Sequence, residues 1–187
     1  MLLWTTLLAR SQGTFFIDQQ STNQTEGSAG LAVGLPMGQS FTPTFSSVSY
    51  LVLFLFDGDI FHNAGGTVLV NLRSNSVTGT ILGTSAAVFV PDEFFGLTNF
   101  VFSTPVAVTP GVTYYFQPVI QSGSLGLGSI LTDGSYTGGS RIVNGSPQPN
   151  FNLWFQEGII AVPEPSSALL ALLGSGVWLS VRRRRVR

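Results

Sequence analysis

The sequence contains no cysteine and no lysine, a single histidine and few charged residues of any kind. Without cysteine, disulfide scaffolds, cysteine-type zinc sites and thiol nucleophiles are excluded. The single histidine, His62, excludes metal sites that need several histidines. Charged residues make up 9% of the chain, whereas about 25% is usual. Because disorder usually accompanies high charge and low hydrophobicity, we expect a chain that is 44% hydrophobic to fold.

The charges that are present are divided unequally along the chain. All eight basic residues are arginines, and five of them lie within the last six positions. Residues 1–165 hold three arginines against all nine acidic residues, which gives this part a formal charge of −6. An acidic body has little with which to neutralise phosphates, so we predict that it does not bind nucleic acid.

The last 27 residues read AVPEPSSALLALLGSGVWLSVRRRRVR and fall into three parts. Pro163-Glu164-Pro165 is a rigid polar break, Ser166–Val181 is apolar and uncharged, and Arg182–Arg185 form a basic cluster. As a helix, residues 166–181 would be about 24 Å long, and snorkelling arginines would let it span a hydrocarbon layer of about 30 Å. Basic residues stay on the cytoplasmic side, so the body is expected outside the cytoplasm. A buried core helix is the alternative, but the segment has no polar stripe.

This tail resembles the PEP-CTERM sorting signal of exported bacterial proteins. The resemblance implies that Pro163, Glu164 and Pro165 are the recognition and processing motif and that Arg182, Arg183, Arg184 and Arg185 provide membrane retention. It also implies handling by exosortase, a membrane-embedded protease-like enzyme, with a transient stay in the inner membrane and the body on the periplasmic side. The expected destination is the cell surface or extracellular matrix of a Gram-negative bacterium, in association with exopolysaccharide or biofilm.

Export also requires an N-terminal signal, and residues 1–13 match one poorly. Leu2–Leu8 is a short apolar run with no basic residue before it, and Arg10 follows it. We interpret residues 1–13 as a degraded or truncated signal segment and favour a true start upstream of Met1. The alternative is that Leu2–Leu8 is a first strand.

Residues 14–158 show strand patterns almost throughout, and residues 159–187 are assigned to the tail. In Ser47–Phe56, Val48, Tyr50, Val52, Phe54 and Phe56 share one face and Leu51, Leu53 and Leu55 the other, as in a central strand covered on both sides. Thr67–Arg73 alternates, with Val68, Val70 and Leu72 pointing inward. The further expected strands are Ile81–Val90, Asn99–Val108, Val112–Ile120 and Asn152–Gln156, and more weakly Gln39–Thr44 and Thr14–Asp18.

Strands that recur every 10 to 15 residues between turn residues predict an all-β fold, an antiparallel β-sandwich followed by one C-terminal transmembrane helix. Thr109-Pro110-Gly111 is a turn signal between two of the strands. The segments Gln39–Thr42 and Phe102–Val106 resemble secreted jelly-roll modules related to galactose-binding-like domains. The resemblance rests on strand spacing and brings no binding residues with it. We interpret Gly123–Gly139, which lacks the lysine of a phosphate-binding loop, as a long flexible loop.

No reactive constellation stands out in the body. Asp57 and Asp59 are weak candidates for a Ca²⁺ site, and we otherwise expect no cofactor and no catalytic residue. His62 is expected in an exposed loop. Five aromatic residues could form a sugar platform but are more typical of a sandwich core; they are Tyr114, Tyr115, Tyr136, Trp154 and Phe155.

The sequence therefore predicts an exported, non-catalytic surface or matrix protein. A further hypothesis is that it binds exopolysaccharide. The alternative is a secreted glycan-active hydrolase that uses loop carboxylates. The candidates for that chemistry are Asp57, Asp59, Asp92, Glu93 and Asp133.

Overall fold

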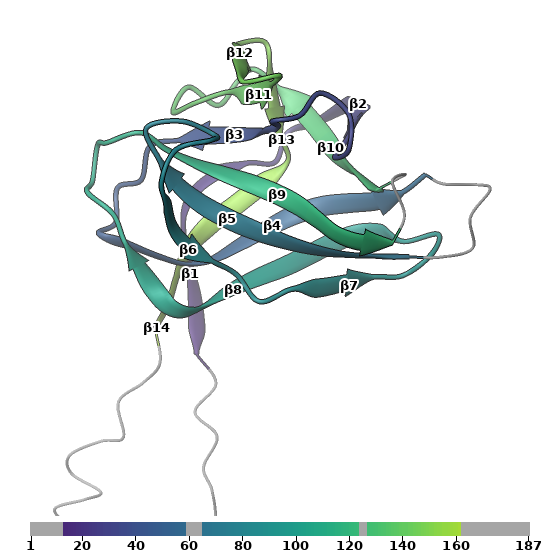
Figure 1. Cartoon of the computed structure of the whole chain (residues 1–187). Coiled ribbons are helices and arrows are strands. Elements are labelled where there is room, and N and C mark those ends of the chain that lie inside the picture. The colour runs from purple at the N-terminus through teal and green to yellow at the C-terminus, as the bar shows by residue number, and fades with distance from the viewer. Residues whose placement is uncertain (1–12, 59–64, 124–126, 162–187) are drawn as a thin grey trace, which may run out of the picture. The chain divides into compact units, whose positions relative to one another are not determined.

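The computed structural model of the chain describes residues 13–58, 65–123 and 127–161. By internal contacts the chain divides into a unit of Phe16–Ile159 and a second unit formed by both chain ends, Met1–Phe15 and Ile160–Arg187. All elements in the described ranges are β-strands (Figure 1), which confirms the all-β class for this part. Within those ranges no helix is long and apolar enough to cross a membrane. The helix predicted at residues 166–181 lies outside the described residues.

Seven strands form a first antiparallel sheet, in the order β1-β14-β4-β10-β13, with β2 paired to β10 and β8 paired to β4. Their bounds are β1 Thr14–Ser21, β2 Gln24–Gly30, β4 Ser47–Asp57, β8 Phe95–Ala107, β10 Leu127–Asp133, β13 Phe151–Leu153 and β14 Phe155–Ala161.

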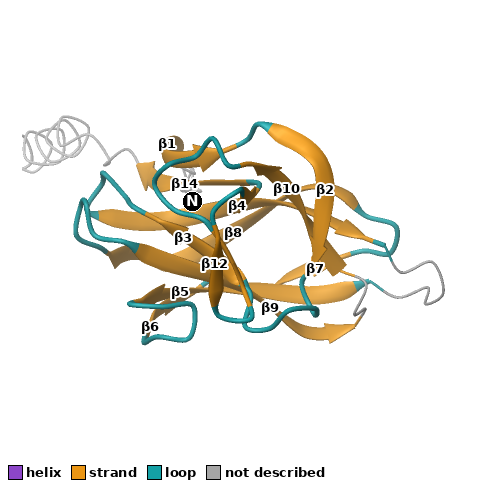
Figure 2. Ribbon diagram, turned by 90° about the horizontal axis from the view of Figure 1, so that it is seen from above, coloured by secondary structure: helices purple, strands orange, loops and turns teal. Residues whose placement is uncertain are grey.

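Seven more strands form a second sheet, in the order β12-β11-β3-β9-β5-β6, with β7 also paired to β5. Figure 2 shows β5, β6 and β9 along one side of the domain and β10 and β14 along the other. The bounds are β3 Gly38–Phe41, β5 Gly66–Ser74, β6 Ile81–Thr84, β7 Val88–Val90, β9 Tyr114–Gly123, β11 Arg141–Val143 and β12 Ser146–Gln148.

β4 is the strand around which the first sheet is built. Along one edge it pairs with β8, from Ser47 to Phe56. Its other edge is shared, because β10 pairs with Leu55–Asp57 and β14 pairs with Tyr50–Leu53. Beyond Ser129, β10 separates from β4 and pairs instead with β13. The backbone N–H of Trp154, between β13 and β14, donates to the Ile130 carbonyl at this fork.

The core lies between the two sheets and takes large side chains from both. Leu53, Leu55 and Phe155 come from the first sheet, and Phe41 and Phe116 from the second, all essentially without solvent exposure. The rings of Phe116 and Phe155 meet edge to face across the sandwich, with centroids 5.3 Å apart. The prediction that Val68, Val70 and Leu72 point inward is confirmed by their burial in the same core.

The facial assignment of Val48 was wrong. Its side chain joins the core together with Leu51, Leu53 and Leu55, whereas Tyr50 and Val52 are buried outside this cluster. The β4–β8 ladder is irregular at this point, because the register shifts between Val48 and Tyr50, whose partners lie five residues apart on β8. Strict alternation of faces is not kept across such an irregularity.

The interpretation of Gly123–Gly139 as a flexible loop was also wrong, because the segment contains β10. Six consecutive residues, Leu127–Thr132, are buried. β10 is hydrogen-bonded along both edges, by β4 and β13 on one side and by β2 on the other. Gly128 suits this crowded position, because a Cβ there would lie 2.3 Å from the Phe56 ring.

Other strand predictions hold with changed boundaries. Ile81–Val90 is divided into β6 and β7, and Ser85 between them makes an isolated bridge to Phe102. Asn152–Gln156 is divided at Trp154 between β13 and β14. The predicted turn at Thr109–Gly111 is present, with the Val112 N–H donating to the Thr109 carbonyl and Gly111 at φ 78°, a backbone conformation that glycine adopts readily.

A buried polar network connects the two sheets near β13. Gln39 on β3 donates through Nε2 to Oδ1 of Asn152 at 2.8 Å and accepts at Oε1 from the Leu153 N–H at 2.9 Å. Asn152 in turn donates to the Asp133 carbonyl. Because these buried groups have hydrogen-bonding partners, the network favours one arrangement of the two sheets and leaves none of these polar atoms desolvated without a partner.

Replacing Phe116 by alanine tests the packing of the core. We expect the free energy of unfolding to fall by about 3–5 kcal/mol, because a fully buried ring leaves a cavity between the sheets. The matched control is F89A, since Phe89 is 65% exposed; its effect should stay within about 0.5 kcal/mol. Urea denaturation of the two variants measures both, and equal losses would contradict this account of the core.

Candidate functional site

A polar groove of about 630 Å³ opens beside β1. It is lined by Asp18–Asn23, by Thr42 and Thr44, and by Ser135–Gly138. These segments are the C-terminal half of β1 with its turn, the residues after β3, and the residues after β10. Hydroxyl and amide groups predominate in the lining, so the groove offers many hydrogen-bonding groups and little fixed charge.

Asp18 holds one wall of the groove in place. Its Oδ2 accepts from the backbone N–H groups of Thr44 at 2.7 Å and Phe45 at 2.8 Å, and Oδ1 accepts from the Thr44 hydroxyl. These bonds tie β1 to the chain between β3 and β4. The carboxylate is thus used for structure, as is common where a short acidic side chain satisfies turn amides.

The hydroxyl of Tyr136 joins the remaining walls. It accepts from the Thr42 N–H at 3.3 Å and donates to Oε1 of Gln19 at 3.4 Å. The ring packs edge to face on Phe155, with centroids 5.2 Å apart, so this side chain connects the groove to the core.

Asp133, at the end of β10, orders the other end of the groove. Its carboxylate accepts from the side-chain amide of Asn23 and from the Ser135 N–H and hydroxyl. The last two bonds form the turn that leads from β10 toward Tyr136. These hydrogen bonds, first those from Ser135, hold the pKa of Asp133 below its ordinary value.

Glu157 lies behind the groove and is completely buried. It stands opposite Leu51 in the β14–β4 ladder, on the face of β14 that it shares with Phe155. Its carboxyl group lies near the Asp18 side chain and the Gln19 backbone, but neither oxygen makes a well-formed hydrogen bond within the described part of the chain. A charge without partners is costly in such a place, so the neutral form is favoured.

The pKa values of Glu157 and Asp18 are therefore shifted in opposite directions. Burial raises the pKa of Glu157 to about 8, and the negative charge of Asp18 adds to the increase. Partial burial also acts to raise the pKa of Asp18, but its hydrogen bonds from Thr44, Phe45 and Gln19 outweigh this and lower it. Burial raises the pKa of Tyr136 to about 12 and, less strongly, that of Tyr50.

Acids with separated pKa values can serve as a catalytic pair when both reach the substrate. Glu157 has no exposed surface, so this pair lacks access to a ligand in the groove. Among the described residues there is also no group of three acidic or histidine side chains placed to hold a metal ion. The groove is instead equipped to form many neutral hydrogen bonds.

The acids selected from the sequence lie in several places. Asp57 ends β4 and is the cross-strand partner of Leu127, whereas Asp133 lies at the far end of β10. Six residues of strand separate them by roughly 20 Å, more than a glycosidase pair requires. Asp92 and Glu93 occupy the turn before β8, and Asp59 and His62 lie outside the described residues. The Ca²⁺ site at Asp57 and Asp59 stays a prediction.

The aromatic residues mostly fill the core, as the sandwich interpretation expected. Tyr114, Trp154 and Phe155 are buried, and Tyr136 packs against the core from the groove. The sequence reasoning missed the groove residues of β1 and the buried position of Glu157. The alternation of Phe155 and Glu157 was the available signal, because residues two apart on a strand share a face.

The tail residues Pro163, Glu164, Pro165 and Arg182–Arg185 follow the last described strand, which ends at Ala161. Residues 161–185 match the PEP-CTERM protein-sorting motif. The match confirms the motif that the tail was expected to contain. The motif is a signal for export by an exosortase system, with processing by a membrane enzyme of that type and a fate at the cell surface or outside the cell. Comparison of the chain with curated proteins found no match.

Replacing Glu157 by glutamine tests its buried, neutral state. The folded-state pKa of about 8 lies above the ordinary 4.5, so its contribution to stability is full below about pH 4.5 and is lost as the pH rises through 8. The groups around it are Asp18, Tyr50 and Tyr136. Between pH 5 and 8.5 the free energy of unfolding of the wild type should fall relative to E157Q by on the order of 4 kcal/mol.

Chemical denaturation across this pH range measures the difference between the two proteins. The matched control is E93Q, because Glu93 is an exposed glutamate in a turn and an exposed carboxyl group keeps its solvation. Curves for E157Q and wild type that stay parallel from pH 5 to 8.5 would show that Glu157 is not held neutral.

Proposed function

We propose that this protein is an exported, non-catalytic component of the cell surface or extracellular matrix that binds polysaccharide in the polar groove. It passes through the inner membrane of a Gram-negative cell with its body on the periplasmic side. There an exosortase-type enzyme recognises Pro163, Glu164 and Pro165 and removes the helix and Arg182–Arg185.

The observation that carries the sorting part of the proposal is the matched motif and its position. It begins at residue 161, where β14 ends, so no separate linker stands between the domain and the signal. Pro163 and Pro165 lack the N–H groups that a sheet ladder requires. Two prolines directly after the last described strand therefore disfavour continuation of its ladder into the motif.

The groove supports the binding part of the proposal. Its volume of about 630 Å³ lies within the range of ligand sites. Its hydroxyl and amide groups can form hydrogen bonds with the hydroxyl groups of sugars. The carboxylates of Asp18 and Asp133 already accept hydrogen bonds from the protein. An occupied carboxylate orients its neighbours without demanding a cationic ligand, so the groove by itself sets no charge for the polymer.

Changing Pro163, Glu164 and Pro165 together to alanine should stop processing. In the producing cell we expect this variant to accumulate in the membrane fraction with Arg187 intact, whereas the wild-type product lacks the arginine cluster. Mass spectrometry of the two C-termini measures this. The control is Ser167→Ala, within the apolar segment, which should be processed normally. A wild-type product that retains Arg187 would exclude cleavage.

Filling the groove with a bulky side chain should block polysaccharide binding. Thr137→Trp places an indole at an exposed position of the lining. We expect retention of the full chain on immobilised exopolysaccharide from the producing cells to fall at least about tenfold, because several hydrogen bonds are lost at once. Thr78→Trp, at an exposed turn far along the chain from these segments, is the control. Equal retention of T137W and wild type would remove the groove from the proposal.

A further inference from the structure

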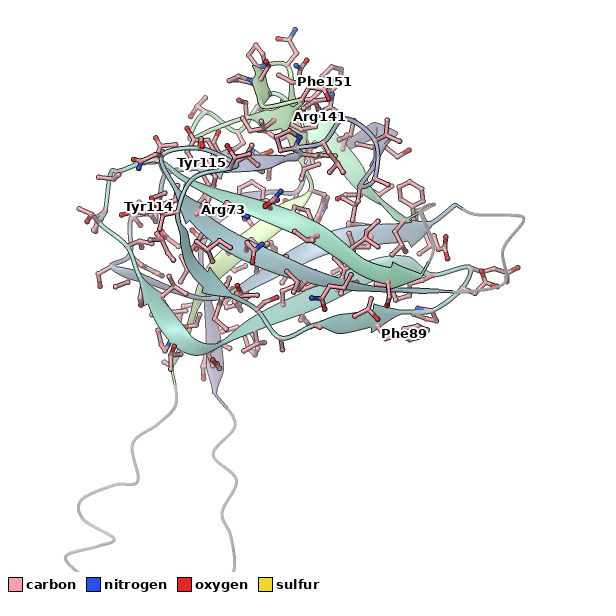
Figure 3. All side chains as sticks on the ribbon, viewed as in Figure 1. Arg73, Phe89, Tyr114, Tyr115, Arg141 and Phe151 are labelled. Carbon is pink, nitrogen blue, oxygen red and sulfur yellow. The ribbon has the colours of Figure 1, made fainter. Side chains whose placement is uncertain are left out.

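Arg141, the first residue of β11, is a cation that makes no ion pair with any acidic residue in the described part of the chain. Its guanidinium carbon lies 5.2 Å from the centre of the Phe151 ring, and Figure 3 shows the two residues together at the end of the domain where β11 and β12 lie. Nε is buried and has no hydrogen-bonding partner within the residues that the structure describes. Partial desolvation without a compensating charge lowers the pKa of Arg141.

A second hollow, of about 410 Å³, lies beside this guanidinium group. Its lining includes Ala29 and Gly30 at the end of β2, Val33 and Gly34 in the following loop, and Asn144 after β11. The lining is mainly apolar, with the Asn144 amide as a neutral polar group. An apolar wall with one convergent cation is a usual design for orienting an anionic ligand.

Arg73, the other arginine in the described part of the chain, shows what a structural arginine looks like here. Its Nε donates to Oε1 of Gln117 at 2.8 Å, and Nη1 donates to the Gly79 carbonyl at 2.7 Å. These bonds secure β5 against β9 and the turn before β6. Within the described residues Arg141 makes no hydrogen bond of this kind, and the contact that holds its guanidinium group is with the Phe151 ring.

We propose that Arg141 and the adjacent hollow form a subsite for the carboxylate of an acidic sugar, such as a uronic acid residue of a polysaccharide. The guanidinium fork pairs with a carboxylate through two parallel hydrogen bonds. The Phe151 ring holds the fork by a cation–π contact, and the apolar lining of the hollow receives the sugar carbons.

A singly charged carboxylate fits this subsite better than a phosphate does. One arginine neutralises one negative charge, and the part of the chain before the basic tail carries a formal charge of −6. A dianion would keep an uncompensated charge in an acidic surrounding. Repulsion from the rest of the domain is screened beyond about 8 Å at physiological ionic strength, so a carboxylate in contact with Arg141 is attracted.

The subsite and the polar groove are connected through β10 and β13. Asp133 accepts a hydrogen bond from Asn23 of the groove, and it is the cross-strand partner of Phe151, over which Arg141 lies. Binding of one polymer at both sites is part of this inference. The inference rests on the proposed polysaccharide binding and adds the chemical class of the polymer.

Calorimetric titration of the full chain, in neutral detergent at 0.15 M salt, tests the subsite. The two probes are tetragalacturonate and its fully methyl-esterified form, which differ in charge. We expect the wild type to bind the acid at least about tenfold more tightly, as for a charge-assisted hydrogen-bonded pair. In R141Q this preference should disappear, and in R141K it should be reduced but present.

The outcomes separate this inference from the proposed function. Equal binding of acid and ester by the wild type, or an unchanged preference in R141Q, would overturn the carboxylate subsite and leave polysaccharide binding in place. Binding of neither probe by the wild type would overturn both the subsite and glycan binding as its basis.

A second variant pair keeps the test independent of how R141Q folds. Val33 is 72% exposed at the mouth of the hollow, so changes there leave the core intact. V33D adds a negative charge and should weaken binding of the acid at least about fivefold, with little effect on the ester. The asparagine of V33N has nearly the same shape as the aspartate of V33D but no charge, so this variant should keep the preference for the acid over the ester. Equal effects of V33D and V33N would contradict the electrostatic basis of the subsite.

Discussion

β4 shares one of its edges between two strands, β10 and β14, and the layout of the first sheet follows from that division. β10 pairs with β4 only as far as Ser129 and then separates, and β13 and β14 pass one after the other from β10 to β4. The separation brings Asp133 beside β13 and sets Glu157 opposite Leu51. Because backbone ladders must be satisfied in a buried sheet, this fork is held by hydrogen bonds such as that from Trp154 to Ile130.

This domain buries two kinds of polar side chain, and the two kinds affect stability differently. Gln39 and Asn152 satisfy each other and the adjacent backbone, so they connect the sheets at little cost. Glu157 is equally buried but has no such partners within the described residues, and it is tolerated because its carboxyl group stays neutral. Satisfied groups of the first kind specify one arrangement of the sheets, whereas an acid of the second kind makes stability depend on pH.

The sequence predicted the strands that carry their own pattern and missed those that depend on neighbours. β4 and β5 alternate or run as continuous apolar stretches, so their type was evident. β2 consists of glycine and small or polar residues, and the apolar residues of β10 are interrupted by Gly128 and Ser129. β10 is a strand because β4, β13 and β2 hold both of its edges, which no local pattern reveals. The groove was missed for a similar reason, since it joins residues about 18–23, 42–44 and 135–138 through tertiary hydrogen bonds. The sorting motif was found because it is contiguous and read from sequence alone.

The strand that leads to the sorting motif also separates the two ends of the domain. Phe151, over which Arg141 lies, begins β13, and Ile159 lies near the end of β14, which pairs with a different strand. Figure 1 shows β11 and β13 at one end of the domain and the end of β14 at the other. The end that carries Arg141 and Phe151 is therefore distant from the last residues of the domain. The sorting motif follows β14, so the proposed ligand binding at β11 and β13 and the sorting of the protein depend on different segments of the chain.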